Sequence, residues 1–318
     1  MANKKKKNWL KLLWLVPTLI LAEGVFFIYW VVPSRVAQTI HEKSQVQKPL
    51  TKTPADDGFK YREVTFLAEN GVTLKGWFMP VPSKKKPLGT LLLSHGVFKN
   101  REQVLSRAEF LVQAGYQVLL FDQRGSGMSS ASAVSGGVYE ANDFLAGEKY
   151  LKDQGLAKKP MVFLGFSMGA MSALRAASKD NGLDGVIADS PLANIKAYVS
   201  KRTMGGKFAS LPGFLDRCLA DYDQLSGLNL SVADLDMVPV VRNLHDLPVL
   251  FISGEKDDLA QPAEVRKLFE KAASHHRRIV YIPDAGHEQT FDQYPIIYTK
   301  AVLGLLADVR KGFPAAKP

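Results

Sequence analysis

The sequence predicts an α/β protein with a mostly parallel central sheet and helices on both faces of that sheet. From about residue 59 onward, short apolar runs typical of buried strands alternate with longer amphipathic stretches typical of helices. The chain has 318 residues, 46% of them hydrophobic and 23% charged, which is an ordinary globular composition. This length suffices for one large domain with an appendage. A long apolar segment near the amino terminus lies outside the alternation and is the expected appendage.

The folded domain is expected over residues 59–318. It opens with two strands, Tyr61–Leu67 and Val72–Met79, which should pair as an antiparallel hairpin because Glu69-Asn70-Gly71 is a turn sequence. Further strands are expected at Thr90–Ser94, Gln117–Phe121, Met161–Gly165, Gly185–Ala188, Val249–Ser253 and Arg278–Ile282. Helices are expected between and after them, at Arg101–Ala114, Val138–Gln154, Met168–Lys179, Ala263–Ala273 and Tyr294–Val309. Residues 192–245 interrupt this order with glycines, a proline and a mixed helical pattern, which favours an inserted cap of about that extent.

The positive charge of the chain is concentrated at the amino terminus. Of the formal net charge of +10, residues 1–53 carry +7, so the rest carries only +3. A domain that binds nucleic acid would keep its excess of basic residues on the folded part, and we therefore expect no nucleic-acid partner. One cysteine, Cys218, excludes an intrachain disulfide and a cysteine-rich metal site. We expect no metal and no organic cofactor, and the sequence leaves the oligomeric state open.

The appendage has the composition of a membrane anchor. A basic tail over residues 1–8, with four consecutive lysines, precedes the apolar segment Trp9–Val32. As a helix, these 24 residues reach about 36 Å, enough to cross a hydrocarbon core of about 30 Å. Residues 33–58 then form a polar, proline-containing linker with room for a short helix.

A cleaved signal peptide is the alternative, since Ala22-Glu23-Gly24 is an acceptable cleavage site. Cleavage there would leave the apolar run Val25–Val32 as the new terminus, so we favour an uncleaved anchor. The lysines before the span place the amino terminus in the cytoplasm and the main domain on the far side of the membrane.

The most informative motif is Gly165-Phe166-Ser167-Met168-Gly169, which follows an expected strand and opens an Ala-rich expected helix. A tight strand-to-helix turn of this kind exposes a serine hydroxyl and requires glycines on either side for close packing. Ser167 is therefore the candidate nucleophile.

A serine nucleophile needs a histidine base and an acid that orients the histidine. Asp257 and His287 each follow an expected strand, and the chain order Ser, Asp, His is the one this architecture requires. Asp257 is the preferred acid and Asp189, at the end of an earlier strand, is the alternative.

Acyl transfer also needs two amides that point at the developing oxyanion. We expect the amide of Met168, directly after the nucleophile, and the amide of Val97, in the turn after the strand Thr90–Ser94. His95, in the same turn, is expected to hold the loop by hydrogen bonds and not to act as a base.

Five motifs together resemble the α/β-hydrolase superfamily over about residues 59–310. They are SHGVFKN (94–100), FDQRGSGMSS (121–130), GFSMGA (165–170), ISGEKDD (252–258) and DAGH (284–287). The chain is most similar to membrane-anchored serine hydrolases of the α/β-hydrolase-domain type, near the prolyl-oligopeptidase and dienelactone-hydrolase branches. The resemblance implies that Ser167, His287 and Asp257 are nucleophile, base and acid, with Val97 and Met168 as oxyanion hole. It also implies that Asp122 and Arg124 are scaffold residues.

The expected function is that of a membrane-anchored serine hydrolase that cleaves a carboxylic ester or related acyl bond through an acyl-enzyme. The expected substrate is a small-molecule or lipid-like acyl compound. A thioesterase, a serine peptidase and a non-catalytic binding protein on the same fold are the alternatives. Four cap residues, Tyr198, Met204, Phe208 and Phe214, are too few to predict a lipid pocket and fit cap packing equally well.

Overall fold

The computed structural model describes residues 2–44, 46, 48–82, 86–180, 182–201, 203 and 208–312, with side chains from residue 14 onward. Its centre is an eight-stranded sheet in the order β1-β2-β4-β3-β5-β6-β7-β8. β2 pairs antiparallel with β1 and β4, and the remaining neighbours are parallel. The strands are β1 (Arg62–Leu67), β2 (Thr73–Met79), β3 (Thr90–Ser94), β4 (Gln117–Phe121), β5 (Met161–Phe166), β6 (Gly185–Asp189), β7 (Val249–Gly254) and β8 (Arg277–Ile282). The predicted α/β-hydrolase fold is confirmed.

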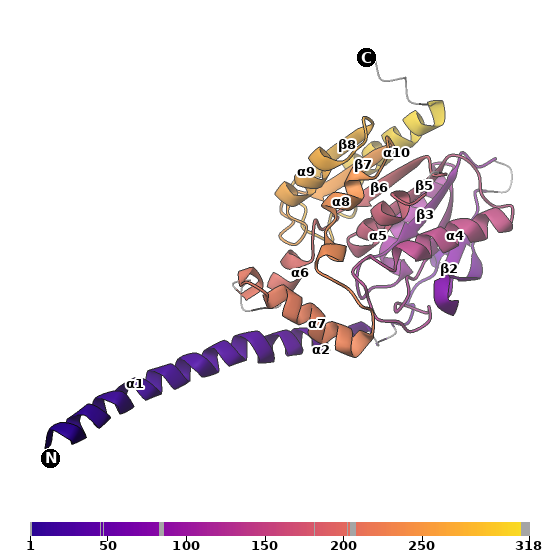
Figure 1. Ribbon diagram of the computed structural model, residues 1–318. Coiled ribbons are helices and arrows are strands. Elements are labelled where there is room, and N and C mark those ends of the chain that lie inside the picture. The colour runs from indigo at the N-terminus through magenta and orange to yellow at the C-terminus, as the bar shows by residue number, and fades with distance from the viewer. Residues whose placement is uncertain are drawn as a thin grey trace.

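Helices cover both faces of the sheet because the buried strands carry apolar side chains on both sides (Figure 1). One face packs against α4, α5, α8 and α9, and the other packs against α3 and α10. These helices are α3 (Leu105–Gln113), α4 (Ala141–Asp153), α5 (Met168–Ala177), α8 (Val238–Arg242), α9 (Pro262–Lys271) and α10 (Pro295–Lys311).

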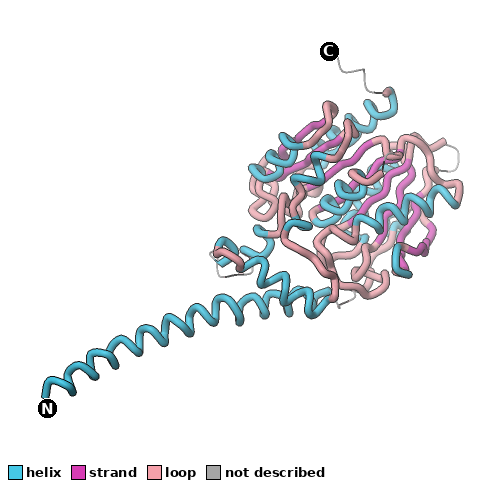
Figure 2. The backbone as a smooth tube through the Cα atoms, in the orientation of Figure 1, coloured by secondary structure: helices cyan, strands magenta, loops and turns pink. Residues whose placement is uncertain are grey.

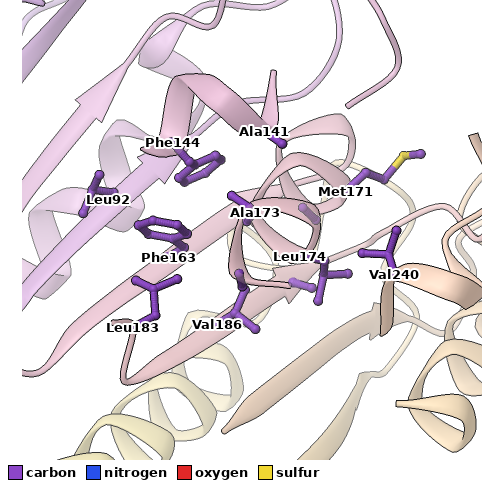
Figure 3. Packing of buried hydrophobic residues seen from close by; sticks show 14 of the residues in the cluster. Leu92, Ala141, Phe144, Phe163, Met171, Ala173, Leu174, Leu183, Val186 and Val240 are labelled. Carbon is purple, nitrogen blue, oxygen red and sulfur yellow. The ribbon is translucent and has the colours of Figure 1, made fainter. Parts of the chain in front are cut away.

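The packing between the sheet and its helices is visible in the larger core cluster (Figure 3). Phe144 of α4 lies against Phe163 of β5 with ring centroids 4.9 Å apart, and Ala173 of α5 lies beside them. The small side chains of α5 bring that helix close to the sheet. Because α5 begins directly after Ser167, this packing fixes the position of the candidate nucleophile.

Residues 192–245, where the sequence predicts a cap, lie between β6 and β7, and the regular elements among the described residues of this range are helical (Figure 2). They are α6 (Lys196–Ser200), α7 (Phe214–Ser226) and α8, with short 3-10 turns at Phe208–Ser210 and Ala233–Leu235. α6 and α7 lie away from the sheet and form the cap. Met204 lies outside the described residues.

The amino-terminal helix is longer than the sequence predicts. α1 (Ala2–Phe26) continues through a π-helical turn, Phe27–Val31, into α2 (Val32–Ser44). The linker was expected from residue 33, but its first twelve residues belong to this helix. The reason is an apolar stripe, Val32, Val36 and Ile40, at four-residue spacing, which packs against the cap.

α1 extends away from the domain while α2 lies along α7 (Figure 1). Large apolar side chains of α1 such as Trp14, Leu21 and Phe26 are exposed. By length and composition, the described helix Trp14–Ser44 is a candidate membrane span.

Candidate active site

Ser167 occupies a strained turn between β5 and α5. Its backbone has φ 54° and ψ −116°, a conformation that a non-glycine residue adopts only when its surroundings enforce it. The enforcement comes from two glycines. A Cβ at Gly165 would lie 1.9 Å from the carbonyl oxygen of Gly169, and a Cβ at Gly169 would lie 2.5 Å from that of Ser94. The turn therefore closes only because both positions lack side chains, as the motif predicts.

The structure brings Ser167, His287 and Asp257 together from three separate loops. The Oγ of Ser167 lies 2.8 Å from Nε2 of His287, and Nδ1 of His287 lies 2.8 Å from Oδ2 of Asp257. A carboxylate can only accept a hydrogen bond, so Nδ1 carries the proton and Nε2 is left to accept the hydrogen of the serine hydroxyl. This is the geometry of a nucleophile, a base and an orienting acid.

Asp257 is held as an acceptor by its own loop. Its second oxygen, Oδ1, accepts hydrogen bonds from the backbone amides of Leu259 at 2.9 Å and Ala260 at 2.7 Å. The loops that carry Asp257 and His287 approach closely because Gly254 has no side chain; a Cβ there would lie 2.3 Å from the carbonyl oxygen of Ala285. The buried carboxylate thus has a fixed orientation toward the imidazole.

Asp189, the alternative acid, points elsewhere. Its Oδ2 accepts hydrogen bonds from Nη2 of Arg107 at 3.0 Å and from Nε of the same guanidinium at 3.2 Å. The hydroxyl of Thr290 donates to Asp189 at 2.9 Å. The carboxylate is fully buried in this ion pair, and His287 makes its carboxylate hydrogen bond to Asp257 instead.

The loop after β3 lies directly against the nucleophile. A Cβ at Gly96 would be 3.3 Å from Cβ of Ser167, and Val97 and Phe98 both line the pocket in front of the serine. The amide of Gly96 donates to Oε1 of Gln103 at 2.8 Å, so it is occupied. The amide of Met168 stands at the amino end of α5, where the first amides have no partner within the helix.

His95 holds this loop, as the sequence analysis predicts. Its Nε2 accepts from the amide of Gln123 at 3.2 Å, so Nδ1 donates to the carbonyl oxygen of Gly96 at 2.8 Å. Burial lowers the pKa of His95, which keeps the ring neutral in that tautomer. This histidine is structural.

Asp122 and Arg124 are also structural. Asp122 accepts from the amide of Arg101 at 2.7 Å and from the amide of Met128 at 2.8 Å, which ties two loops together. Arg124 donates from Nε and Nη2 to Oδ1 of Asp143 at 2.9 and 2.7 Å. Neither side chain is among those that line the pocket at Ser167.

The pocket in front of Ser167 is apolar. Among the described residues that line it, none has a charged side chain. Burial raises the pKa of Cys218, in its wall, to about 12, so the thiol stays neutral at physiological pH. The wall comes from the cap, the loops after β3 and β4, the start of α5, and α2; it includes Leu192, Ile195, Val199, Leu215, Leu219, Val36 and Ile40.

The sequence analysis leaves a lipid pocket open, because the walls of this pocket come from segments that are far apart in the chain. Of the cap residues considered in the sequence, Tyr198 lines the pocket, whereas Phe208 and Phe214 pack within the cap, with ring centroids 6.1 Å apart. The contribution of α2 was missed, although the stripe Val32, Val36 and Ile40 is a visible signal. Within the described residues, no group of three or more His, Cys, Asp or Glu side chains is placed to hold a metal ion.

Comparison with known proteins finds a family model that matches part of the sequence and solved structures with a similar fold. Residues 85–223 match the family model described as serine aminopeptidase, S33, a range that includes Ser167 and ends before Asp257 and His287. The fold is similar to that of an esterase from Pyrococcus furiosus, with a TM-score of 0.66, 29% identity, and coverage of 82% of this chain and 96% of the esterase.

Two relatives extend the comparison. A membrane protein of Saccharomyces cerevisiae, described as uncharacterized, is 26% identical over 242 residues, which cover 76% of this chain and 78% of the relative. The lysophosphatidylserine lipase ABHD12 of Danio rerio is 30% identical over 168 residues, which cover 51% of this chain and 41% of the lipase.

Proposed function

Since this chain belongs to the α/β-hydrolase superfamily, we propose that it is a serine hydrolase that cleaves a carboxylic ester through an acyl-enzyme intermediate. The observation that carries the proposal is the chain of two 2.8 Å hydrogen bonds that links Ser167 through His287 to Asp257. Strained backbone conformations cost free energy and cluster at functional sites, and here the strained serine faces a base that an acid orients.

In the first step, the Oγ of Ser167 attacks the ester carbonyl while Nε2 of His287 takes the hydroxyl proton. Asp257 keeps Nδ1 protonated and stabilises the imidazolium that forms. The ester oxygen then leaves with that proton as the alcohol, and the acyl group remains on Ser167. In the second step, a water molecule gives a proton to His287 and attacks the acyl-enzyme. The imidazolium then returns this proton to the Oγ of Ser167 as the carboxylic acid leaves, which regenerates the hydroxyl.

The amides of Val97 and Met168 are the proposed oxyanion hole. Three observations support this choice: Gly96 lies against Ser167, Val97 follows it in the same loop and lines the pocket, and Met168 directly follows the nucleophile. Loss of one donor of this kind typically costs a factor of about 10² to 10³ in kcat. Two amides from separate elements favour acyl transfer over a binding role.

A peptidase is the second candidate, because the matching family model is described as serine aminopeptidase. An aminopeptidase must bind a free α-amino group, which calls for a carboxylate near the nucleophile. Among the described residues that line the pocket, none is acidic, and this observation favours an uncharged ester. Assays with p-nitrophenyl esters and with aminoacyl p-nitroanilides test the choice: we expect turnover of the esters at least tenfold faster, and the reverse order would favour the peptidase.

We also propose that the amino-terminal helix anchors the protein in a membrane, with the amino terminus in the cytoplasm and the hydrolase domain on the other side. The length and composition of Trp14–Ser44 and the exposed apolar side chains of α1 support the anchor. The four lysines Lys4–Lys7 support the orientation.

A further inference from the structure

The helix that forms the candidate membrane span also forms one wall of the pocket at Ser167. Val36 and Ile40 of α2 line this pocket together with Met168 and Met171 of α5. Val36 is buried in a cluster with Phe214 and Cys218 of α7 and is 6% exposed. α2, which continues the helix of the candidate anchor, is therefore part of the pocket wall as well as a connection to the membrane.

The contact between α2 and the cap is extensive. Beyond the apolar cluster, the ring of His41 lies edge-on to Tyr222 of α7, with centroids 6.4 Å apart. The hydroxyl of Tyr222 donates to the carbonyl oxygen of Val134 at 2.8 Å, and Val134 lines the same pocket. One aromatic residue thus joins α2, the cap and a pocket loop.

In the proposed membrane orientation, the distance along the helix places Val36 within the interfacial layer of the bilayer and Ile40 just beyond it. Val36 and Ile40 lie four and eight residues after Val32, the last residue of the apolar segment, so the helical rise between them and the segment is about 6 and 12 Å. The interfacial layer of a bilayer is on the order of 6 Å thick on each side of the hydrocarbon core. The pocket therefore lies within reach of molecules that reside in the membrane, with α2 and α7 on the same side of the sheet as the span (Figure 1).

Resting on the proposed ester hydrolysis, we propose that Val36 and Ile40 form part of a binding site for a long acyl chain. The substrate class is then a lipid ester whose apolar chain is dissolved in the membrane. None of the described residues that line the pocket is charged and most are apolar, so the lining fits a hydrocarbon chain better than a charged group. Ile40 and Val36 are specificity residues in this proposal, because they contact the chain and not the reacting atoms.

The test uses the full-length protein in detergent and compares p-nitrophenyl palmitate with p-nitrophenyl butyrate. Ile40→Trp fills the chain site, and each methylene that loses its contact costs roughly fourfold. We expect kcat/KM for palmitate to fall at least tenfold while that for butyrate changes less than twofold. Thr39→Trp, on the exposed face of the same helix, is the matched control and should leave both values unchanged.

Equal palmitate-to-butyrate ratios in Ile40→Trp, Thr39→Trp and wild type would overturn the proposal. Should Ile40→Trp fail to fold, Val36→Ala decides, since it removes wall contacts without adding bulk: a reduced ratio supports the chain site and an unchanged ratio overturns it. Hydrolysis that persists in Ser167→Ala would instead overturn the proposed function, and this inference with it. The two failures are therefore distinguishable.

Discussion

Arg107 and Asp189 form a fully buried ion pair beneath the proposed catalytic histidine. The guanidinium carbon of Arg107 lies 5.2 Å from the ring centroid of Phe166, and that ring lies 5.4 Å from the ring of His287. Asp189 also binds Thr290, three residues after His287. The pair thus supports the floor of the site and the loop of the histidine, whereas Asp257 makes the direct contact with the imidazole.

The two aspartates should therefore respond differently to substitution. Asp257→Asn removes the acceptor that fixes the tautomer of His287, and we expect kcat to fall by about 10⁴ with little change in melting temperature. Asp189→Asn leaves the buried charge of Arg107 without its partner, which costs about 3–5 kcal/mol of stability. Thermal unfolding and steady-state kinetics on both variants check this.

The control for this comparison is the double variant Arg107→Met/Asp189→Leu, which replaces the ion pair by apolar side chains and should recover part of the lost stability. A catalytic defect of 10⁴ in a fully folded Asp189→Asn, with an active Asp257→Asn, would reverse the assignment of the acid.

The glycines of the serine turn should tolerate no side chain. Gly169→Ala places a Cβ 2.5 Å from the carbonyl oxygen of Ser94, so the turn must open. We expect a loss of stability of about 1–3 kcal/mol, as for other overpacked sites, and a much larger loss of activity. Gly304→Ala in α10 is the control: nothing lies within 4 Å of the added Cβ, and an alanine should stabilise the helix by up to about 1 kcal/mol. Equal effects of the two changes on melting temperature would contradict this explanation of the motif.

Stability should fall with rising pH through the titration of Glu148. Burial raises the pKa of this carboxyl to about 7 in the folded protein, although Lys152 lies 2.6 Å away. The unfolded chain loses the proton near its ordinary pKa of 4.5. The stabilisation is thus complete below about pH 4.5 and is lost as the pH rises through about 7.

Glu148→Gln removes this titration and should reduce the fall in melting temperature between about pH 4.5 and pH 8. Asp153→Asn, an exposed change on the same helix α4, is the control and should behave as the wild type. If Glu148→Gln retains the pH dependence of the wild type, the carboxyl is not responsible for it.

The orientation in the membrane has its own test. In intact cells, we expect an external protease to digest the hydrolase domain, because the lysines before the span keep the amino terminus in the cytoplasm. A tag on the amino terminus should be digested only after the membrane is opened. Digestion of the domain only after lysis would show the opposite orientation.

The sheet and the three site residues could be predicted because their signals are local. Each buried strand is a short apolar run, and Ser167, Asp257 and His287 each follow such a run, so a parallel sheet brings them to one edge. The choice of Asp257 over Asp189 depended on loop detail that the chain order alone does not determine. The structure separates them through the ion pair of Asp189 with Arg107, which is 82 residues away in the chain.

The pocket could not be predicted because its walls come together only in three dimensions. Val36 and Ile40 are far in sequence from Leu215 and Leu219 of the cap, and nothing local indicates that α2 packs against α7. The stripe at Val32, Val36 and Ile40 indicates an amphipathic helix, but the sequence analysis expects a linker from residue 33 onward. The surface against which this helix packs is determined only by the tertiary structure.

Labelling with a fluorophosphonate probe tests the central claim most directly, because the probe reacts only with a serine whose hydroxyl a neighbouring base activates. We predict that the full-length wild type is labelled at Ser167, that Ser167→Ala is not labelled, and that Ser172→Ala, a change one turn further along α5, is labelled as the wild type. Absence of labelling in a folded wild type, or undiminished labelling of Ser167→Ala, would contradict the assignment of Ser167 as the nucleophile.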